Sequence, residues 1–198
     1  MDYYETIASN FQHTIETVAL SADALAAPIE RSAGLMASAL LSDRKIISCG
    51  NGPDAALAQL FTSYLLGVYR QERPALPTFT LGADSASLTG ITQANGSNDV
   101  YSRQLRALAQ PGDVVLVISS SEPADNLSRA MQAAHERNAQ LVLLSNQASD
   151  DLASLVRAED VEIRVDTDNN TRAVEIYTMA IHSICTLIEL GLFGAHQE

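Results

Sequence analysis

The segment Gly50–Asp54, with the sequence Gly-Asn-Gly-Pro-Asp, carries the residue types of an anion-binding loop. It follows the apolar run Ile46–Cys49 and precedes a helical pattern whose first position is Pro53. A strand–loop–helix unit of this kind aims backbone N–H groups and a helix N-terminus at an anion. Asp54 argues against that use, because a carboxylate ~4 Å from a phosphate oxygen costs roughly 4 kcal/mol at the dielectric near a protein surface.

Two further polar segments follow predicted strands. Three serines come directly after the apolar run Val114–Ile118, and their hydroxyl and N–H groups could hold phosphate oxygens, or serve only as turn and cap residues. The segment Leu81–Ser85 follows another strand. Because ligands of open α/β sheets bind beyond the carboxyl ends of the strands, we expect these loops to form one pocket. The predicted pocket residues are Asn51, Gly52, Asp54, Asp84, Ser119, Ser120 and Ser121.

The elements that must position these loops alternate between strand and helix patterns. The predicted strands are Lys45–Cys49, Thr78–Leu81, Val114–Ile118, Leu141–Leu144 and Val161–Arg164. Helical patterns fill the intervals between them, which indicates parallel strands joined by right-handed crossovers. The sequence therefore predicts a doubly wound, three-layer α/β/α fold in a single domain over residues 1–198, with N-terminal helices over 1–41 and the α/β core over 42–198.

The two ends of the chain carry helical patterns that a single sheet does not account for. Residues 4–41 are helical by periodicity, and Pro28 predicts a break between two helices. The last helix, predicted over 171–190, is apolar on more than one face, which is typical of a buried helix. We expect these terminal helices to form a bundle between subunits of a homo-oligomer; the alternative is a helical cap within one subunit.

Composition narrows the function classes. The net charge of −12 argues against direct nucleic-acid binding, because it leaves no basic patch to neutralise phosphates. No apolar run approaches the ~20 residues of a membrane span, and the acidic N-terminus is unlike a signal peptide, so we expect a cytoplasmic protein without membrane contact. The two cysteines are too few for a metal cluster.

In this order, the motifs resemble the sugar isomerase (SIS) fold, and the chain is similar to the phosphoheptose isomerase group and to the DnaA initiator-associating protein family. The segments that carry the resemblance are Ile46–Gly52, Arg70–Pro77, Tyr101–Ser121, Asp160–Val165 and Ile181–Phe193. The resemblance implies a five-stranded parallel sheet between layers of helices. It also implies a tetramer built through the terminal helices, in agreement with the bundle expected above.

The resemblance also implies catalytic positions, and the sequence departs from several of them. The isomerases carry a His and a Glu one helical turn apart, a pair that can ligate zinc, and these positions are Leu60 and Tyr64 here. A Gln of the last helix is replaced by Val174, whereas His182 remains, with Glu175 as its candidate partner on the same helix face. One His cannot hold a catalytic zinc, which needs about three protein ligands, so we expect no cofactor.

These departures, together with Asp54, Glu122 and Ala124 in the two loops, favour a catalytically degenerate tetrameric scaffold or regulator. Its partner would be a protein such as the replication initiator DnaA, bound through Leu192 and Phe193 in a short tail after the last helix. Two alternatives remain open. One is a sedoheptulose 7-phosphate isomerase of lipopolysaccharide heptose synthesis, and the other is a non-catalytic sensor of a sugar derivative or sugar phosphate.

Overall fold

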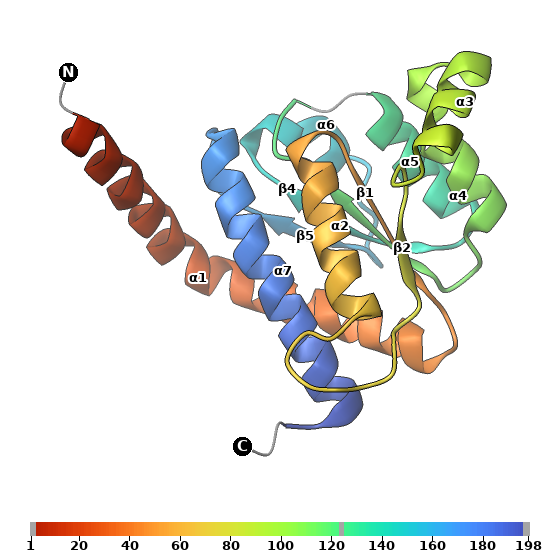
Figure 1. The fold of residues 1–198 in the computed structure, drawn as a ribbon, viewed down its shortest axis with the longest axis horizontal. Helices are drawn as coiled ribbons and strands as arrows, with labels where there is room; N and C mark the ends of the chain where they lie inside the picture. The colour runs from red at the N-terminus through yellow and green to blue at the C-terminus, as the bar shows by residue number, and fades with distance from the viewer. Residues whose placement is uncertain (1–2, 123–124, 196–198) are drawn as a thin grey trace.

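Five parallel strands form the centre of the structure, a computed structural model that describes residues 3–122 and 125–195 (Figure 1). The strands are β1 (Ile46–Gly50), β2 (Thr78–Thr80), β3 (Val114–Ile118), β4 (Gln140–Ser145) and β5 (Val161–Arg164). They lie in the order β2-β1-β3-β4-β5. The prediction of a five-stranded parallel α/β fold is confirmed, and each expected strand is present with ends shifted by one residue at most.

Helices cover both faces of the sheet (Figure 1). They are α1 (Tyr3–Leu41), α2 (Pro53–Leu66), α3 (Ser85–Asn95), α4 (Ser102–Leu108), α5 (Asp125–Glu136), α6 (Asp150–Ala153) and α7 (Asn170–Phe193), with 3₁₀ turns η1 (Ser97–Asp99) and η2 (Gln147–Ser149). The core on one face joins the strands to α1, α2 and α7, and the core on the other face joins them to α4, α5 and α6. The sheet is thus the middle layer of three.

The sequence of β3 shows why both faces are covered. Val114 and Leu116 point into the core beneath α1, α2 and α7, whereas Val115 and Val117 point into the core beneath α4 and α5. All four side chains are buried. Burying an aliphatic side chain of this size stabilises the fold by about 1.5–3 kcal/mol, so an uninterrupted apolar strand is favoured only where both faces are dry.

The predicted break at Pro28 is wrong, because α1 is a single helix that continues through this residue. A proline inside a helix costs ~3 kcal/mol, since it removes a backbone N–H and crowds the preceding turn. The second half of α1 offsets this cost by burying Leu25, Ala33 and Met36 against the sheet and α7. The first half of α1 projects away from the body of the protein (Figure 1).

Helix α7 continues three residues beyond its predicted end, so Leu192 and Phe193 belong to its last turn and the predicted tail is wrong. Leu192 packs against the core, which offsets the cost of about 1 kcal/mol for Gly191 inside a helix. Phe193 is 40% exposed. By length and composition α7 could cross a membrane, but it packs against α1 and α2, so it is a core helix of this domain.

The strand order sets the place of the site. The chain leaves β1 toward β2 on one side and leaves β3 toward β4 on the other, so β1 and β3 flank the point where the order reverses. The two strands end together, with Gly50 paired to Ile118. A crevice between the loops that follow such strands is the usual ligand site of doubly wound folds. Residues 50–54 at the end of β1, here called the glycine loop, and residues 119–121 after β3, the serine loop, therefore face each other there.

Candidate functional site

A cavity of about 350 Å³ lies at the carboxyl end of β1. Its polar lining residues include Asn51, Gln59, Thr92, Ser97, Tyr101 and Asn126. None of the described lining residues carries a formal charge. Amide and hydroxyl groups of this kind can both donate and accept hydrogen bonds, which suits the hydroxyl groups of a sugar. Of the predicted pocket residues, Asn51 and Gly52 line this cavity, whereas Asp54, Asp84 and Ser119–Ser121 do not.

Two cavity residues that the sequence did not reveal hold Asn51 in place. Asn51 exchanges two side-chain hydrogen bonds with Asn126 on α5, at 2.9 and 3.0 Å. The Tyr101 hydroxyl donates to the Gly50 carbonyl at 2.6 Å and to Asn51 Oδ1 at 3.2 Å. Burial raises the pKa of Tyr101 to about 12, so the hydroxyl keeps its proton and its role as donor at neutral pH. The loop after β1 is therefore rigid before any ligand arrives.

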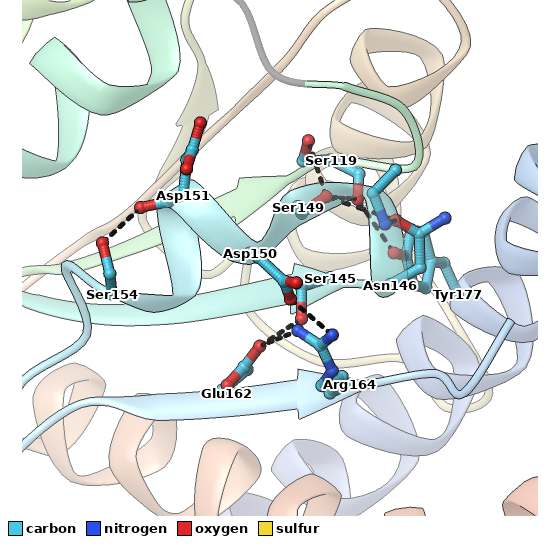
Figure 2. Close-up of polar contacts among 11 residues, drawn as sticks. Ser119, Ser145, Asn146, Ser149, Asp150, Asp151, Ser154, Glu162, Arg164 and Tyr177 are labelled. Carbon is cyan, nitrogen blue, oxygen red and sulfur yellow. Dashed lines mark hydrogen bonds and ion pairs between the residues drawn. The ribbon is translucent and has the colours of Figure 1, made fainter. Parts of the chain in front are cut away.

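The serine loop is fixed by a buried polar layer behind it (Figure 2). The Ser119 carbonyl accepts from the Tyr177 hydroxyl at 2.9 Å and from Ser149 Oγ at 3.0 Å. The Ser120 carbonyl accepts from Asn146 Nδ2 at 2.8 Å. The Ser119 N–H donates to the Leu144 carbonyl of β4 at 3.0 Å, and the Ser120 N–H donates to Asp54, so these contacts fix the course of the loop from both sides.

The sequence predicts some of the residues that hold the serine loop better than others. Asn146 directly follows β4, as the serines follow β3, and Ser149 ends the 3₁₀ turn η2 that comes next, so polar residues after a buried strand would have pointed to them. Tyr177 lies within an apolar helix, and only the tertiary structure shows its hydroxyl reaching the serine loop. Ala124, at the end of that loop, lies outside the described residues.

Asp54 connects the two loops directly. Its Oδ2 accepts a hydrogen bond from the Ser120 N–H at 2.9 Å, and the residue is only 3% exposed. Its Oδ1 is buried and has no hydrogen-bond partner among the described residues. Burial raises the pKa of the Asp54 carboxyl group, and the hydrogen bonds from Ser120 oppose this shift without cancelling it. The structure therefore places a poorly solvated acid between the two loops.

Replacing Asp54 with Asn is expected to stabilise the protein at high pH. The folded-state pKa of Asp54 lies above its ordinary value of 3.8, so its contribution to stability is lost as pH rises through the folded-state pKa. The asparagine side chain keeps an acceptor for Ser120 without a buried charge, and we expect a gain of about 1–2 kcal/mol in unfolding free energy at pH 8. Urea unfolding should show this gain at pH 8 and its disappearance near pH 4. An equal difference at both pH values would contradict the assignment.

Asp84 serves a local structural purpose. It is the N-cap of α3, where its carboxylate accepts from the Ala86 and Ser87 N–H groups at 3.0 and 3.3 Å and from the Ser87 hydroxyl. The Ser87 hydroxyl and the Ala86 N–H lower the pKa of Asp84. The residue is exposed and is absent from the lining of the cavity.

A second group of candidate side chains lies where α2 packs on α7. The Tyr64 hydroxyl is 3.3 Å from His182 Nε2, and the Tyr69 hydroxyl donates to the His182 carbonyl at 3.1 Å. The rings of Tyr64 and Tyr69 are 4.8 Å apart between centroids. His182 is partly buried, so its imidazole is held by an aromatic pair and still meets solvent. Leu60, one turn before Tyr64 on α2, packs against the core.

The predicted pairing of Glu175 with His182 is wrong. Glu175 accepts from Thr14 Oγ1 at 2.9 Å and forms an ion pair with Arg172 at 3.1 Å, so it faces α1. Seven residues of helix rise ~10.5 Å, which is too far for a contact between the two side chains. Among the described residues, the His182 ring is hydrogen-bonded to the Tyr64 hydroxyl.

The donor set around His182 does not fit zinc. Leu60 and Val174 offer no ligating atom, and Tyr64 already occupies His182 Nε2. Across residues 3–122 and 125–195, no three His, Cys, Asp or Glu side chains come together in a way that could hold a metal ion. A catalytic zinc needs about three such ligands, so no step of the chemistry is assigned to one here.

Comparison with known proteins gives consistent matches. The family model of the SIS domain matches residues 3–146. The chain is 39% identical over 195 residues to a phosphoheptose isomerase from Chromohalobacter salexigens, covering 98% of this chain and 99% of that protein. It is 42% identical over 194 residues to a phosphoheptose isomerase from Halorhodospira halophila, covering 98% of each. A solved phosphoheptose isomerase from Francisella tularensis superposes with a TM-score of 0.91 at 31% identity, covering 95% of this chain and 98% of that one.

These matches correct the function expected from the sequence. The prediction of a catalytically degenerate scaffold that binds a replication initiator is wrong, because full-length relatives at 39–42% identity are named as isomerases. An altered residue at a family position is therefore not by itself a lost function. The structure shows that Tyr64, one of those positions, is a hydrogen-bond partner of His182.

Proposed function

Since this chain belongs to the SIS domain family, we propose that it is a phosphoheptose isomerase, which interconverts sedoheptulose 7-phosphate and the corresponding aldose phosphate. The observation that carries the proposal is similarity to proteins named phosphoheptose isomerase along almost the whole chain. The site geometry supports it, because an uncharged polar cavity lies at the carboxyl end of β1, and the serines that follow the neighbouring strand β3 are held by buried hydrogen bonds. A phosphorylated sugar presents the hydroxyl groups and the anion that these two parts suit.

The reaction requires a proton to move between adjacent carbons of the sugar. A base removes a proton from C1 of the ketose, the electrons of that C–H bond form an enediolate, and the proton returns to C2 while the oxygens exchange theirs. The proposal assigns this exchange to His182, because histidine is the side chain that most often serves as a general acid and base, and this one is partly buried between α2 and α7. The Tyr64 hydroxyl orients the imidazole through Nε2 and can pass a proton to it.

The direct test is incubation of the purified protein with sedoheptulose 7-phosphate, followed by chromatographic detection of the aldose phosphate. Unphosphorylated sedoheptulose serves as the matched control, since the proposal assigns the phosphate to the serine loop. We expect product from the phosphorylated sugar at a much higher rate than from the free sugar. Absence of product from either sugar across pH 6–8.5 would remove the proposal.

We also propose that the protein is a homo-oligomer, in keeping with a tetramer, assembled through α1. The projecting half of this helix exposes Ile7, Phe11, Ile15 and Leu20, by 56 to 82% of each side chain. A groove of about 520 Å³ between α1 and α7, lined mainly by apolar residues, offers a second copy a place to pack. Sedimentation equilibrium should give a multiple of 21.2 kDa for the wild type.

A charged substitution tests which surface forms the oligomer. The double variant Phe11→Glu/Ile15→Glu should shift the equilibrium toward the monomer, because two charges cannot be buried in an apolar interface without a large desolvation cost. Ser9→Glu, which adds a charge at an exposed polar position of the same helix, should leave the assembly intact. A monomeric wild type, or an unchanged double variant, would contradict the proposed surface.

We propose a cytoplasmic location on the basis of the cysteines. Cys49 and Cys185 are both unpaired and buried. Burial raises the pKa of each thiol to about 12, so neither reacts readily. Free buried thiols without disulfides are typical of proteins in reducing compartments.

A further inference from the structure

The carboxyl group of Asp54 occupies the position that a bound anion would take. It lies in the first turn of α2, between the loops that follow β1 and β3, at the reversal point of the strand order. Its Oδ2 accepts a hydrogen bond from the Ser120 N–H at 2.9 Å. The loop that carries this N–H is held from behind by Asn146 and Tyr177, so the donor has a fixed direction. Any anionic ligand that used this donor would meet Asp54 first.

Asp54 has little room to move away from this position. A Cβ atom added at Gly50 would lie 2.8 Å from the Asp54 Cβ atom, which shows how closely the end of β1 packs against the acid. The Asp54 side chain is therefore confined on the β1 side. A ligand that approaches Ser120 must be accommodated by a change in the charge of Asp54 rather than by its withdrawal toward β1.

Among the described residues around Asp54, no free cation compensates its charge. The strand and loops that flank it carry Cys49, Tyr101 and Glu122, and Glu162 and Arg164 act on the neighbouring Tyr177 from β5. Besides Tyr177, helix α7 carries Arg172, which is paired with Glu175 at 3.1 Å, His182, which contacts Tyr64, and Glu189, which is paired with Arg73. Arg164 already forms ion pairs with Asp150 at 2.6 Å and with Glu162 at 3.6 Å (Figure 2). An ionised Asp54 would therefore face the negative charge of a phosphate across a poorly screened distance.

We propose that binding of a phosphate ester at this crevice is coupled to uptake of a proton by Asp54. The inference rests on the proposed function, because it takes the sugar phosphate as the ligand. Protonated Asp54 keeps the hydrogen bond from Ser120 through Oδ2 and gains a donor at Oδ1, the buried oxygen that has no partner among the described residues. Protonation also removes the negative charge from Oδ1, whose burial without a hydrogen-bond partner makes the ionised form costly.

The test is titration calorimetry with sedoheptulose 7-phosphate at pH 8, in two buffers that differ in ionisation enthalpy. The second pKa of a phosphate ester is about 6, so the free ligand is a dianion at this pH. The difference in heat between the buffers reports the protons taken up. We expect an uptake of about one proton per ligand, and an apparent Kd that weakens about tenfold for each pH unit above the pKa of Asp54.

Two substitutions assign the proton to this residue. Asp54→Asn imitates the protonated acid, so it should bind about tenfold or more tightly than the wild type at pH 8, with an uptake smaller by about one proton. Asp43→Asn makes the same chemical change in the exposed turn before β1, at the opposite edge of the sheet, and should behave as the wild type. Asn tolerates the positive φ of this turn, so the control variant should fold.

Each outcome bears on the inference. Wild-type binding without proton uptake at pH 8 overturns it, and this measurement needs no variant to fold. Equal proton uptake by the wild type and Asp54→Asn also overturns it, as does an absence of ester binding by both proteins from pH 5 to 8.5. Proton-coupled binding without turnover would support it and remove the isomerase proposal, whereas turnover with binding independent of pH would do the reverse.

Discussion

Replacing Arg73 with Ala is expected to lower the unfolding free energy by about 3–5 kcal/mol, because it leaves a buried carboxylate without its partner. Arg73, between α2 and β2, forms an ion pair with Glu189 of α7 at 2.9 Å, and their side chains are 1% and 4% exposed. The same guanidinium donates to the carbonyls of Tyr64 and Leu65 at the end of α2. One side chain thus joins the end of α2 to the last turns of α7.

Differential scanning calorimetry measures this effect. For a domain of this size, each kcal/mol shifts Tm by about 2–4 °C, so we expect a decrease of about 6–20 °C. The matched control is Arg106→Ala, which breaks an exposed ion pair with Glu136 and should cost less than about 1 kcal/mol. The double variant Arg73→Met/Glu189→Leu removes both charges and should be more stable than Arg73→Ala. A loss below about 1 kcal/mol for Arg73→Ala would contradict the assigned role.

Replacing His182 with Ala is expected to lower kcat for sedoheptulose 7-phosphate by about 10²–10⁴-fold, the usual contribution of a positioned acid–base group. The proposed mechanism assigns the proton transfer to this imidazole, which the Tyr64 hydroxyl contacts through Nε2. Its partner Tyr64 should contribute less. Tyr64→Phe removes one hydrogen bond worth about 1 kcal/mol, so kcat should decrease about fivefold while the ring contact with Tyr69 is kept.

The control for this prediction is His13→Ala, an exposed histidine on the projecting half of α1. It should leave kcat unchanged, and circular dichroism should show that all three variants are folded. Equal activity of the wild type and His182→Ala would assign the proton transfer to another group. If Tyr64→Phe kept the wild-type kcat, the Tyr64 hydroxyl would have no part in the proton transfer.

The sheet could be predicted from the sequence because its strands are buried on both faces. The bounds of β3 and β5 were predicted to the residue, and the remaining strands within one residue. Helices were predicted less well, since their ends depend on tertiary packing. Pro28 has the local signature of a break, yet the buried contacts of α1 keep the helix continuous.

The candidate site was predicted in part, and the missing part follows from distance along the chain. Asn51 and Ser119–Ser121 directly follow strands, so topology alone places them near the crevice. Tyr101, Asn126 and Tyr177 reach the loops from helices and turns far away in sequence, and no local pattern marks them. Glu175 shows the converse error, since a shared helix face does not bring residues two turns apart into contact.

The proposed isomerase activity is tested most directly by proton NMR of sedoheptulose 7-phosphate incubated with the protein in D₂O. A base-mediated transfer through an enediolate exchanges the migrating proton with solvent. The account predicts an aldose phosphate that carries deuterium at C2, formed by the wild type and strongly diminished with His182→Ala. A ketose that stays unchanged and unlabelled with the wild type would contradict it.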